Sequence, residues 1–421
     1  MQPQASSPDN WQSPSLRGGP PHRRYHGLDL IRASMMLLGV VLHTALCFHP
    51  TPGLWLYQDV TGNPLAGFLV VGIHVFRMPI FFTMAGFFAA MVWQKQGAYL
   101  FAVNRFNRIV LPLVLGWFVV FPLLAWSISF AWIYASGEGR VSLTEAVPRI
   151  NFSVDFRQAG PIHLWFLYYL VWFYGVIVGG RAILHRFRYS KWIIGQICEK
   201  ISGRAWSWLL PPVLILLSYG LMLPMTNPGI DTPLGWAPLW HVMALYFFYF
   251  GVGWIGYRKR GIIEHLKKSA WFCLIAGSVF LFLACASTMA WYLYPGGIEV
   301  VGSRRTIFLW AQFLQVTTVW FLLAGFIGVG EKILRGKHPV VRYLVDASLW
   351  IYLLHFPLTI LIPSLFRYWE IPSTIKMVVM IILVILPLLL SYHFLVRRTA
   401  LGVMMQGGYL KPKLGTSTRP S

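Results

Sequence analysis

The sequence has little charge and very few acidic residues. Asp, Glu, Lys and Arg make up 11% of its 421 residues, with 13 acidic against 35 basic side chains. A soluble domain carries about 25% charged residues, so the composition excludes an ordinary soluble protein. No Walker motif or HExxH is present, which argues against the P-loop nucleotide sites and the zinc sites that those motifs mark.

Cysteine is also scarce. The four cysteines form no CxxC pair and have no framework spacing, so they are interpreted as small buried apolar residues. The loops between apolar runs are short apart from about 136–160 and 185–207, which leaves no room for a separate soluble domain. Residues 1–26 are rich in Pro, Ser, Gln and Arg and predict a disordered tail without a cleavable signal peptide.

Long apolar runs, in contrast, are abundant, since 57% of the residues are hydrophobic. Ten runs have about the length that spans a bilayer. They predict an all-α polytopic integral membrane protein, with a membrane domain at 27–397 and a tail at 398–421. The runs are 28–48, 65–93, 108–135, 161–184, 208–224, 239–257, 270–294, 305–329, 342–366 and 374–396.

Lys and Arg are distributed unequally between alternate loops. One side of the ten runs, which includes both chain ends, holds 26 of the 35, and the other side holds 7; Arg32 and Arg77 lie within runs. Cytoplasmic loops carry an excess of Lys and Arg, so we expect about ten transmembrane helices and both termini in the cytoplasm. The basic charge is then a topology signal, and a nucleic-acid partner is not expected.

Arg32 and His43 lie eleven residues apart in the first run. At about 100° per residue they share one face of a helix, and at 1.5 Å rise they lie about 16 Å apart along its axis. Ionisable side chains inside a membrane normally face a protein interior or a water-filled cavity and have a task there. The pair therefore predicts a lined path through the membrane.

The predicted topology gives the other intramembrane polar groups a depth. His74 and Arg77 lie one turn apart on one face of the second run. No two histidines of the predicted outer leaflet have the i, i+4 spacing of helical ligands and carboxylates are absent at that depth, so a metal site is not expected. For His241, a hydrogen bond to a neighbouring helix is the simpler interpretation. The histidines of the outer leaflet are His43, His74, His163, His241 and His355.

The face shared by Arg32 and His43 also indicates a chemistry. Arg binds phosphate through a bidentate fork, and Asp29, three residues earlier, can hold that fork by an i, i+3 pair. Histidine titrates near neutral pH and suits general-base work on a hydroxyl. The arrangement fits a long phosphorylated donor that enters from the cytoplasm and reacts near the outer side.

Five motifs are similar to those of the acyltransferase 3 family of membrane O-acyltransferases. In the second motif, Ala85 stands where the family usually carries Ser. The resemblance covers about residues 25–395, and the last two motifs are similar to the glucan biosynthesis protein C group. The motifs are Leu28–Arg32 with His43, Phe76–Phe82 with Ala85–Phe88, Arg105–Ile109 with Leu111-Pro112, His163–Leu167, and Ala347–His355 with Pro357.

This resemblance implies acyl transfer from cytoplasmic acyl-CoA to a sugar hydroxyl on the periplasmic side of a bacterial inner membrane. In the glucan group the acyl unit is succinyl and the acceptor is an osmoregulated periplasmic glucan. No permanently bound cofactor is implied, and a glucan synthase is a candidate partner. Arg32 and His43 would be essential, and His163 and His355 would lie near the reaction centre.

A mechanism follows as a hypothesis. Acyl-CoA would bind its phosphates on Arg32, Arg105 and Arg108, with Asp29 orienting Arg32 and the pantetheine arm along the Arg32–His43 face. His43 would remove the acceptor's proton, and Arg77 would stabilise the oxyanion. An acyl-His43 intermediate is the alternative route.

The acceptor is predicted to bind beside the outer loop 136–160 and Trp165, with His74, His163 and His355 near the substrate. An interfacial Trp beside a solvated loop is the alternative interpretation. A different function would be a transporter or flippase in which Arg32, His43, His74 and Arg77 form a substrate or proton path. The repeated halves that are frequent in such proteins are not evident, and a scaffold for a glucan synthase would leave the Arg32–His43 alignment unexplained.

Overall fold

The protein is helical throughout the part that the computed structural model describes. No strand occurs there, and one isolated bridge joins Ile298 and Gly302. The prediction of an all-α fold is therefore confirmed. The predicted tails, 1–26 and 398–421, lie almost wholly outside the described residues. These are residues 25–136, 142–150, 160–186, 206–298, 302–334, 336, 338–399, 401–402 and 405.

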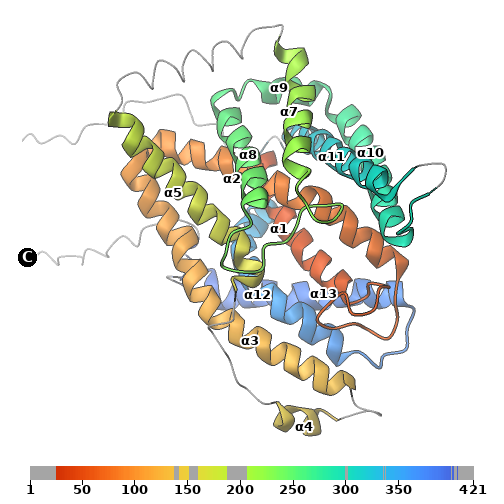
Figure 1. The fold of residues 1–421 in the computed structure, drawn as a ribbon. Helices are drawn as coiled ribbons and strands as arrows, with labels where there is room; N and C mark the ends of the chain where they lie inside the picture. Colours follow the sequence, from red (N-terminus) through yellow and green to blue (C-terminus); the bar gives the residue numbers. More distant parts are fainter. Residues whose placement is uncertain are drawn as a thin grey trace, which may run out of the picture.

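Each of the ten apolar runs overlaps a long helix (Figure 1). In the described ranges, seven helical stretches are long and apolar enough to cross a membrane, and one of these, Pro64–Tyr134, joins two helices. The number of spans and the orientation of the termini stay predictions. The helices are α1 (His26–Leu46), α2 (Pro64–Arg105), α3 (Leu111–Ser136), α5 (Trp165–Arg186), α7 (Trp206–Met222), α8 (Trp240–Arg258), α10 (Ala270–Leu293), α11 (Arg304–Ile333), α12 (Pro339–Leu365) and α13 (Ser373–Ser391), with the shorter α4 (Leu143–Ala146) and α9 (Ile262–Lys268).

A single glycine turns the chain within α2. Gly97 has φ 76° and ψ 178°, a conformation outside the helical region that glycine adopts without steric cost. The predicted second run ends just before this residue. The turn separates the long apolar part of α2 from a last segment that ends at Arg105 and continues into a π-helical turn, Phe106–Val110.

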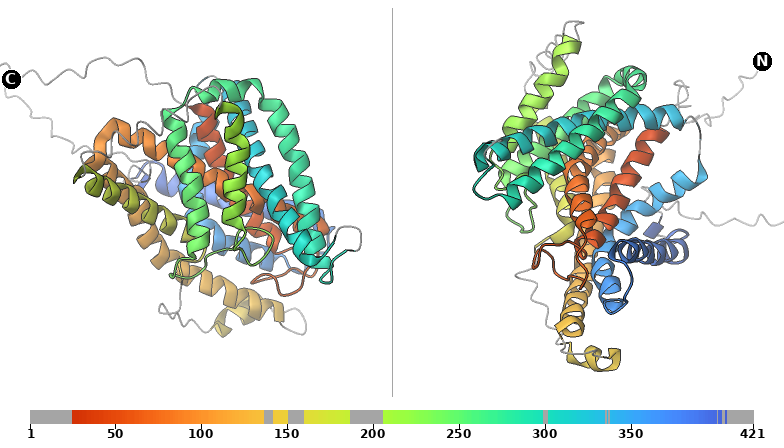
Figure 2. Two further views of the ribbon diagram at one scale, coloured as in Figure 1. Left: turned by 45° about the horizontal axis from the view of Figure 1, so that its top comes forward. Right: turned by 90° about the vertical axis from the view of Figure 1, so that its right-hand side faces the viewer.

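Helix α1 lies inside the bundle, packed against α2, α11, α12 and α13 (Figures 1 and 2). Its first turn is closed by Glu331 of α11, whose Oε1 accepts from the backbone N–H groups of Gly27 at 2.9 Å and Leu28 at 3.3 Å. The first N–H groups of a helix have no partner within the helix, and a carboxylate also favours the positive end of its dipole. Glu331 therefore anchors the start of the helix that carries Arg32 and His43.

Helices α2 and α8 cross at two glycines. A Cβ at Gly86 would collide with the backbone carbonyl of Phe250, and a Cβ at Gly253 would collide with that of Thr83. Small residues at such crossings let two helix backbones approach closely inside a membrane. Gly86 belongs to the second family-like motif, so part of that motif serves helix packing. Helices α10 and α11 likewise lie side by side along their length (Figure 2).

The connection between α1 and α2, residues 47–63, is fixed to the start of α13. Asp59 and Lys376 form an ion pair at 2.7 Å with both side chains fully buried. The Lys376 ammonium also donates to the carbonyl of Arg367 at 2.9 Å. Lys376 is one of the seven Lys and Arg residues that the sequence assigns to the side opposite the chain ends. The structure instead pairs it inside the protein, because a buried carboxylate faces it.

Candidate active site

A basic cluster, Arg32, Arg105 and Arg108, lies at the N-terminal end of α1. Arg32 Nη2 is 3.4 Å from Asp29 Oδ1, so the ion pair predicted from the spacing is present. The guanidinium of Arg32 also lies 4.8 Å from the ring centre of Phe88 in α2. The Asp29 carboxylate and the aromatic face of Phe88 together hold this cation between α1 and α2.

Arg105 joins the basic cluster from the end of α2. Its guanidinium lies 5.2 Å from the ring centre of Phe101 and 5.4 Å from that of Tyr174 in α5. The Nε atom of Arg105 is buried and has no hydrogen-bond partner among the described residues. A buried guanidinium nitrogen without an acceptor is costly in a folded protein, so this atom is suited to meet a ligand oxygen.

Arg108 completes the basic cluster from the π-helical turn after α2. Its Nε donates to the carbonyl of Met405 at 3.0 Å, and its charge interacts with those of Arg32 and Arg105. Asp346 of α12 also interacts with Arg108. Three arginines drawn from three places in the fold form one positive site, which suits a ligand with several negative charges.

Three of the predicted histidines form a second cluster, the histidine centre of His43, His163 and His355. The ring centres of His43 and His355 are 5.3 Å apart, as are those of His163 and His355. Phe356 of α12 contacts the His43 ring at 4.8 Å and the His163 ring at 4.9 Å. Helices α1 and α12 and the turn before α5 therefore bring together residues that lie up to 312 positions apart.

Hydrogen bonds to backbone carbonyls fix two of these rings. His355 Nδ1 lies 2.7 Å from the Tyr352 carbonyl, and His163 Nε2 lies 3.2 Å from the Leu353 carbonyl. A carbonyl only accepts, so these nitrogens carry the proton and the opposite nitrogens of the neutral rings offer a lone pair. His355 Nε2, His163 Nδ1 and His43 Nδ1 have no hydrogen-bond partner in the described part of the chain. The centre therefore presents several polar atoms that a substrate can satisfy.

Arg77 of α2 reaches the histidine centre across Gly39 of α1. A Cβ at Gly39 would collide with Arg77 Nη1 and would lie 3.7 Å from His355 Nε2. Gly39 lies seven residues after Arg32 and four before His43, on the same helix face. Among the described residues Arg77 makes no ion pair. A guanidinium without a carboxylate partner inside a membrane protein is suited to bind a substrate anion.

Trp55 covers His43 from the 47–63 connection. The two rings are stacked with centres 5.5 Å apart and 19° between their planes, and Trp55 also contacts the ring of Phe356 at 5.6 Å. His43 nevertheless keeps part of its surface accessible, whereas His163 and His355 are buried. Trp55 and Phe356 were not predicted, because no spacing rule links a loop tryptophan to a helix 300 residues away.

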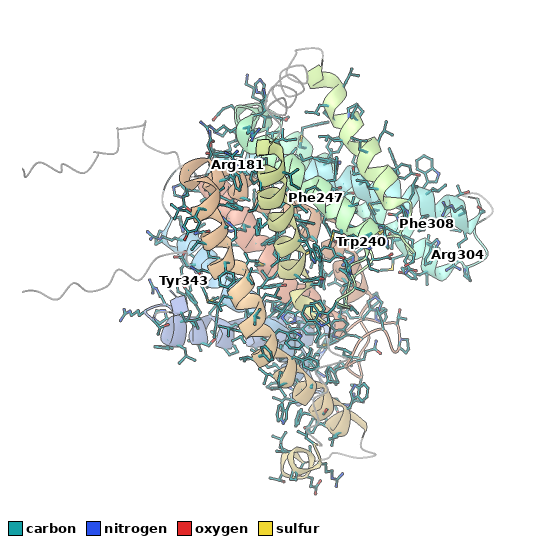
Figure 3. The ribbon with its side chains drawn as sticks, turned by 60° about the vertical axis from the view of Figure 1, so that its left-hand side comes forward. Arg181, Trp240, Phe247, Arg304, Phe308 and Tyr343 are labelled. Atoms are coloured by element: carbon teal, nitrogen blue, oxygen red, sulfur yellow. The ribbon has the colours of Figure 1, made fainter. Side chains whose placement is uncertain are left out.

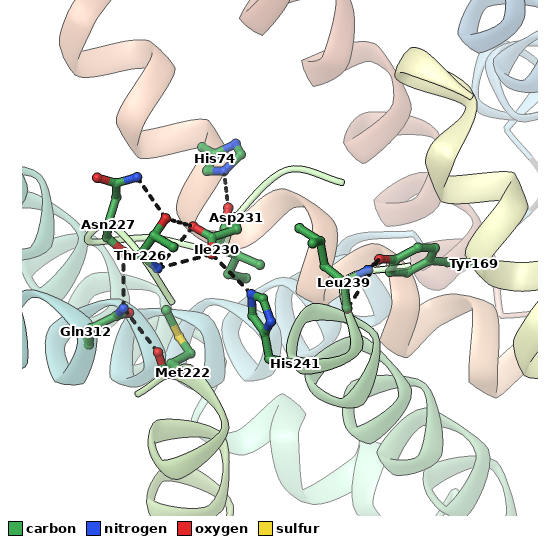
Figure 4. Close-up of polar contacts among 10 residues, drawn as sticks. All are labelled: His74, Tyr169, Met222, Thr226, Asn227, Ile230, Asp231, Leu239, His241 and Gln312. Carbon is green, nitrogen blue, oxygen red and sulfur yellow. Dashed lines mark hydrogen bonds and ion pairs between the residues drawn. The ribbon is translucent and has the colours of Figure 1, made fainter. Parts of the chain in front are cut away.

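His74 and His241 belong to the polar network of Figure 4, and His74 also interacts electrostatically with His43 and Arg77. His74 Nε2 is 3.0 Å from the carbonyl of Ile230, and His241 Nε2 is 3.2 Å from Asp231 Oδ2. The Asp231 carboxylate also accepts from the hydroxyl of Thr226 at 2.8 Å. The expectation that carboxylates are absent near the outer histidines is therefore wrong, because the chain between α7 and α8 folds back and supplies one.

Trp165 is a core residue at the start of α5. It is 7% exposed, and its ring stacks on Tyr246 with centres 5.6 Å apart. This packing gives no support to Trp165 as a saccharide platform, and that role stays a prediction. Arg149 ends a short 3-10 helix, Val147–Arg149, but most of the predicted acceptor loop, including residues 140 and 155–157, lies outside the described residues.

Comparison with known proteins shows the family of the chain. The profile of the acyltransferase 3 family, described as an acyltransferase domain, matches residues 25–396. The chain is a member of the acyltransferase 3 family. Two curated relatives are named glucans biosynthesis protein C, one from Escherichia coli O6:K15:H31 (strain 536 / UPEC) and one from Shigella dysenteriae serotype 1 (strain Sd197). They are 25% and 24% identical over 368 residues, which cover 81% of this chain and 83% of each relative. No solved structure matches the chain.

The family assignment makes the chain an acyltransferase and a multi-pass membrane protein. All five acyltransferase 3 motifs supply or contact members of the two clusters. The first motif supplies Arg32 and His43, and the third supplies Arg105 and Arg108. The second contacts both clusters, through Phe88 at Arg32 and through Arg77 at the histidine centre. The last two motifs supply His163 and His355. The partners outside these motifs, Gly39 and Glu331, were missed because hydropathy shows that helices exist but not which helices touch.

Proposed function

We propose that this acyltransferase moves a succinyl group from acyl-CoA, entering from the cytoplasm, to a hydroxyl of a periplasmic glucan across a bacterial inner membrane. One observation carries the proposal: a three-arginine cluster and a three-histidine centre lie at the two ends of one face of α1. Arg32 and His43 are eleven residues apart, about 16 Å along the axis. The phosphorylated end and the reacting end of one long donor can occupy both sites.

The donor would lie along α1. The basic cluster supplies charge-assisted hydrogen bonds to its phosphates, and the unpartnered Arg105 Nε adds a donor at that end. The pantetheine arm would follow the face that runs through Gly39, where Arg77 occupies the space of the missing side chain. The thioester carbonyl would then lie beside Arg77, which closes that face.

The chemistry at the histidine centre is acyl transfer. His43 removes the proton of the acceptor hydroxyl as its oxygen bonds to the thioester carbonyl carbon. Arg77 stabilises the oxyanion, which collapses with cleavage of the carbon–sulfur bond, and the proton passes to the departing thiolate. The lone pairs of His163 and His355 would orient the incoming hydroxyl. The histidine centre and Arg77 together would supply a polar atom for each step.

A succinyl donor places a second negative charge near the thioester. Arg77 makes no ion pair within the described residues, so its guanidinium can meet the free carboxylate as well as the oxyanion. The names of the curated relatives support a glucan as acceptor. A glucan synthase is the partner that would supply such an acceptor.

The experiment uses purified protein in liposomes with labelled succinyl-CoA inside and glucan outside. Label on the glucan supports the enzyme, and glucan movement without label supports a transporter. His43→Gln should lower transfer about 10²–10⁴-fold, the usual contribution of a general base. His265→Gln on α9, outside both clusters, is the matched control and should transfer at the wild-type rate. Full transfer by His43→Gln would refute the scheme.

A further inference from the structure

A cavity of about 570 Å³ opens between the part of α2 just before its turn at Gly97 and the end of α8, and the histidine centre does not line it. This volume lies within the range of small-molecule sites, about 300–1,000 Å³. Its walls combine aromatic rings with three consecutive cations, which no step of the proposed reaction uses. The main lining residues are Trp93, Trp254, Tyr257, Arg258, Lys259 and Arg260.

The aromatic side chains of this cavity already hold cations. Trp93 and Trp254 meet edge to face with ring centres 5.9 Å apart. The guanidinium of Arg181, labelled near one end of α5 in Figure 3, lies 5.6 Å from the centre of Trp93. Arg260 lies 5.4 Å from the centre of Tyr257. The cavity therefore offers flat π faces and positive charge side by side, the pairing that a phosphorylated purine requires.

The cavity adjoins the basic cluster. Trp93 contacts Phe101 with ring centres 5.1 Å apart, and Phe101 lies under the guanidinium of Arg105. On the other wall, the ring centres of Tyr257 and Phe87 are 5.2 Å apart. Phe87 is followed by Phe88, whose ring lies under the guanidinium of Arg32. One aromatic ring on the first side, and two on the second, thus separate the cavity from the arginines assigned to the donor's phosphates.

The cavity also lies at a suitable distance from the reaction centre. Ala90, which lines it, is thirteen residues from Arg77 on the same helix. At 1.5 Å per residue this is about 20 Å, a distance that the diphosphate and the extended pantetheine arm would cover together.

We infer that this cavity binds the 3′-phosphoadenosine end of acyl-CoA, an inference that rests on the proposed function. The adenine stacks on the tryptophan rings, and Arg258, Lys259 and Arg260 bind the 3′-phosphate. The diphosphate then lies on the basic cluster, and the arm continues along α1. An anionic lipid headgroup shares the phosphate chemistry, but it has no purine for the two tryptophans.

The test removes two cations from the rim of the cavity. For Arg258→Gln with Arg260→Gln, we expect the KM for acyl-CoA to rise about tenfold, equivalent to about 1.4 kcal/mol, with kcat nearly unchanged. Acyl-pantetheine lacks the nucleotide, so its KM should be the same in the wild type and the variant. The matched control is Lys267→Gln with Lys268→Gln on α9, which removes the same charge away from the cavity and should leave both KM values unchanged.

Binding of coenzyme A and of adenosine 3′,5′-bisphosphate to the same proteins, in nanodiscs of zwitterionic lipid, separates this inference from the proposed function. Weaker binding to the variant supports the site even if no protein transfers an acyl group. Transfer by the wild type with no change of KM in the variant overturns the site and leaves the function standing. An equal rise in the variant's KM for acyl-pantetheine also overturns the site. So does a variant that loses binding of phosphatidylglycerol but binds coenzyme A like the wild type.

Discussion

At the scale of single residues, Gly39 determines where Arg77 can lie. The guanidinium of Arg77 occupies the space that any larger side chain at position 39 would fill, and the same space borders His355 Nε2. Protein interiors are close-packed and accommodate an added methyl group poorly. The approach of Arg77 to the face shared by Arg32 and His43 therefore depends on a residue without a side chain.

Gly39→Ala should displace Arg77 and lower acyl transfer about a hundredfold, the scale expected when a catalytic group shifts by about 1 Å. The measurement is the initial rate with acyl-CoA and acceptor in liposomes. Gly220→Ala on α7 is the matched control, since a Cβ there meets nothing within 4 Å. A Gly39→Ala rate within about twofold of the wild type would show that Arg77 has no defined position in the reaction.

At the scale of elements, the buried Asp59–Lys376 pair holds the 47–63 connection against α13. That connection carries Trp55 over His43, and Arg367 adds a hydrogen bond from Nη1 to the carbonyl of Gln58 at 3.2 Å. A charge left alone after removal of its buried partner is strongly destabilising. The position of Trp55 over the histidine centre thus depends on a polar contact between two residues that are 317 positions apart in the sequence.

Lys376→Met should lower the free energy of unfolding by about 3–5 kcal/mol, because Asp59 is left buried and unpaired. Denaturant unfolding of the purified protein measures the change. Lys267→Met, which breaks the exposed pair with Glu264 at 3.0 Å, should change it by less than about 1 kcal/mol. Adding Asp59→Asn to Lys376→Met should recover part of the loss. Equal effects of the two lysine variants would contradict a structural role for the buried pair.

The sequence predicts the elements better than their partners. Apolar runs locate the ten long helices, and the eleven-residue spacing of Arg32 and His43 places both on the face that meets α2 and α12. The Asp29–Arg32 pair follows from local spacing in the same way. Local spacing does not predict the contacts of Glu331 with Gly27 and of Asp231 with His241. These contacts depend on how distant segments fold together, which no helical period encodes.

At the scale of the whole molecule, the two clusters lie at different ends of one helix bundle. The basic cluster gathers the N-terminal end of α1 and the α2–α3 junction, while the histidine centre gathers the other end of α1 with α12 and the start of α5. The unequal loop charges predict that the first end faces the cytoplasm. A donor and an acceptor from opposite compartments would then meet at the histidine centre.

Reporter fusions test this orientation. Alkaline phosphatase should be inactive when fused at the C-terminus and active when fused in the 223–239 connection, since the enzyme folds only outside the cytoplasm. Green fluorescent protein should give the opposite pattern. A phosphatase that is active at the C-terminus would show an odd number of spans or an inverted bundle.

The placement of Arg32 and His43 on one continuous helix has a consequence for donor selection. The helix is fixed at its first turn by Glu331, and its rise of 1.5 Å per residue sets the distance between Arg32 and His43. Under the proposed function, an acyl donor with a shorter or longer arm would not place its thioester beside Arg77 and the histidine centre. Arm length would be selected by α1 and acyl identity by Arg77, so the two preferences can change separately.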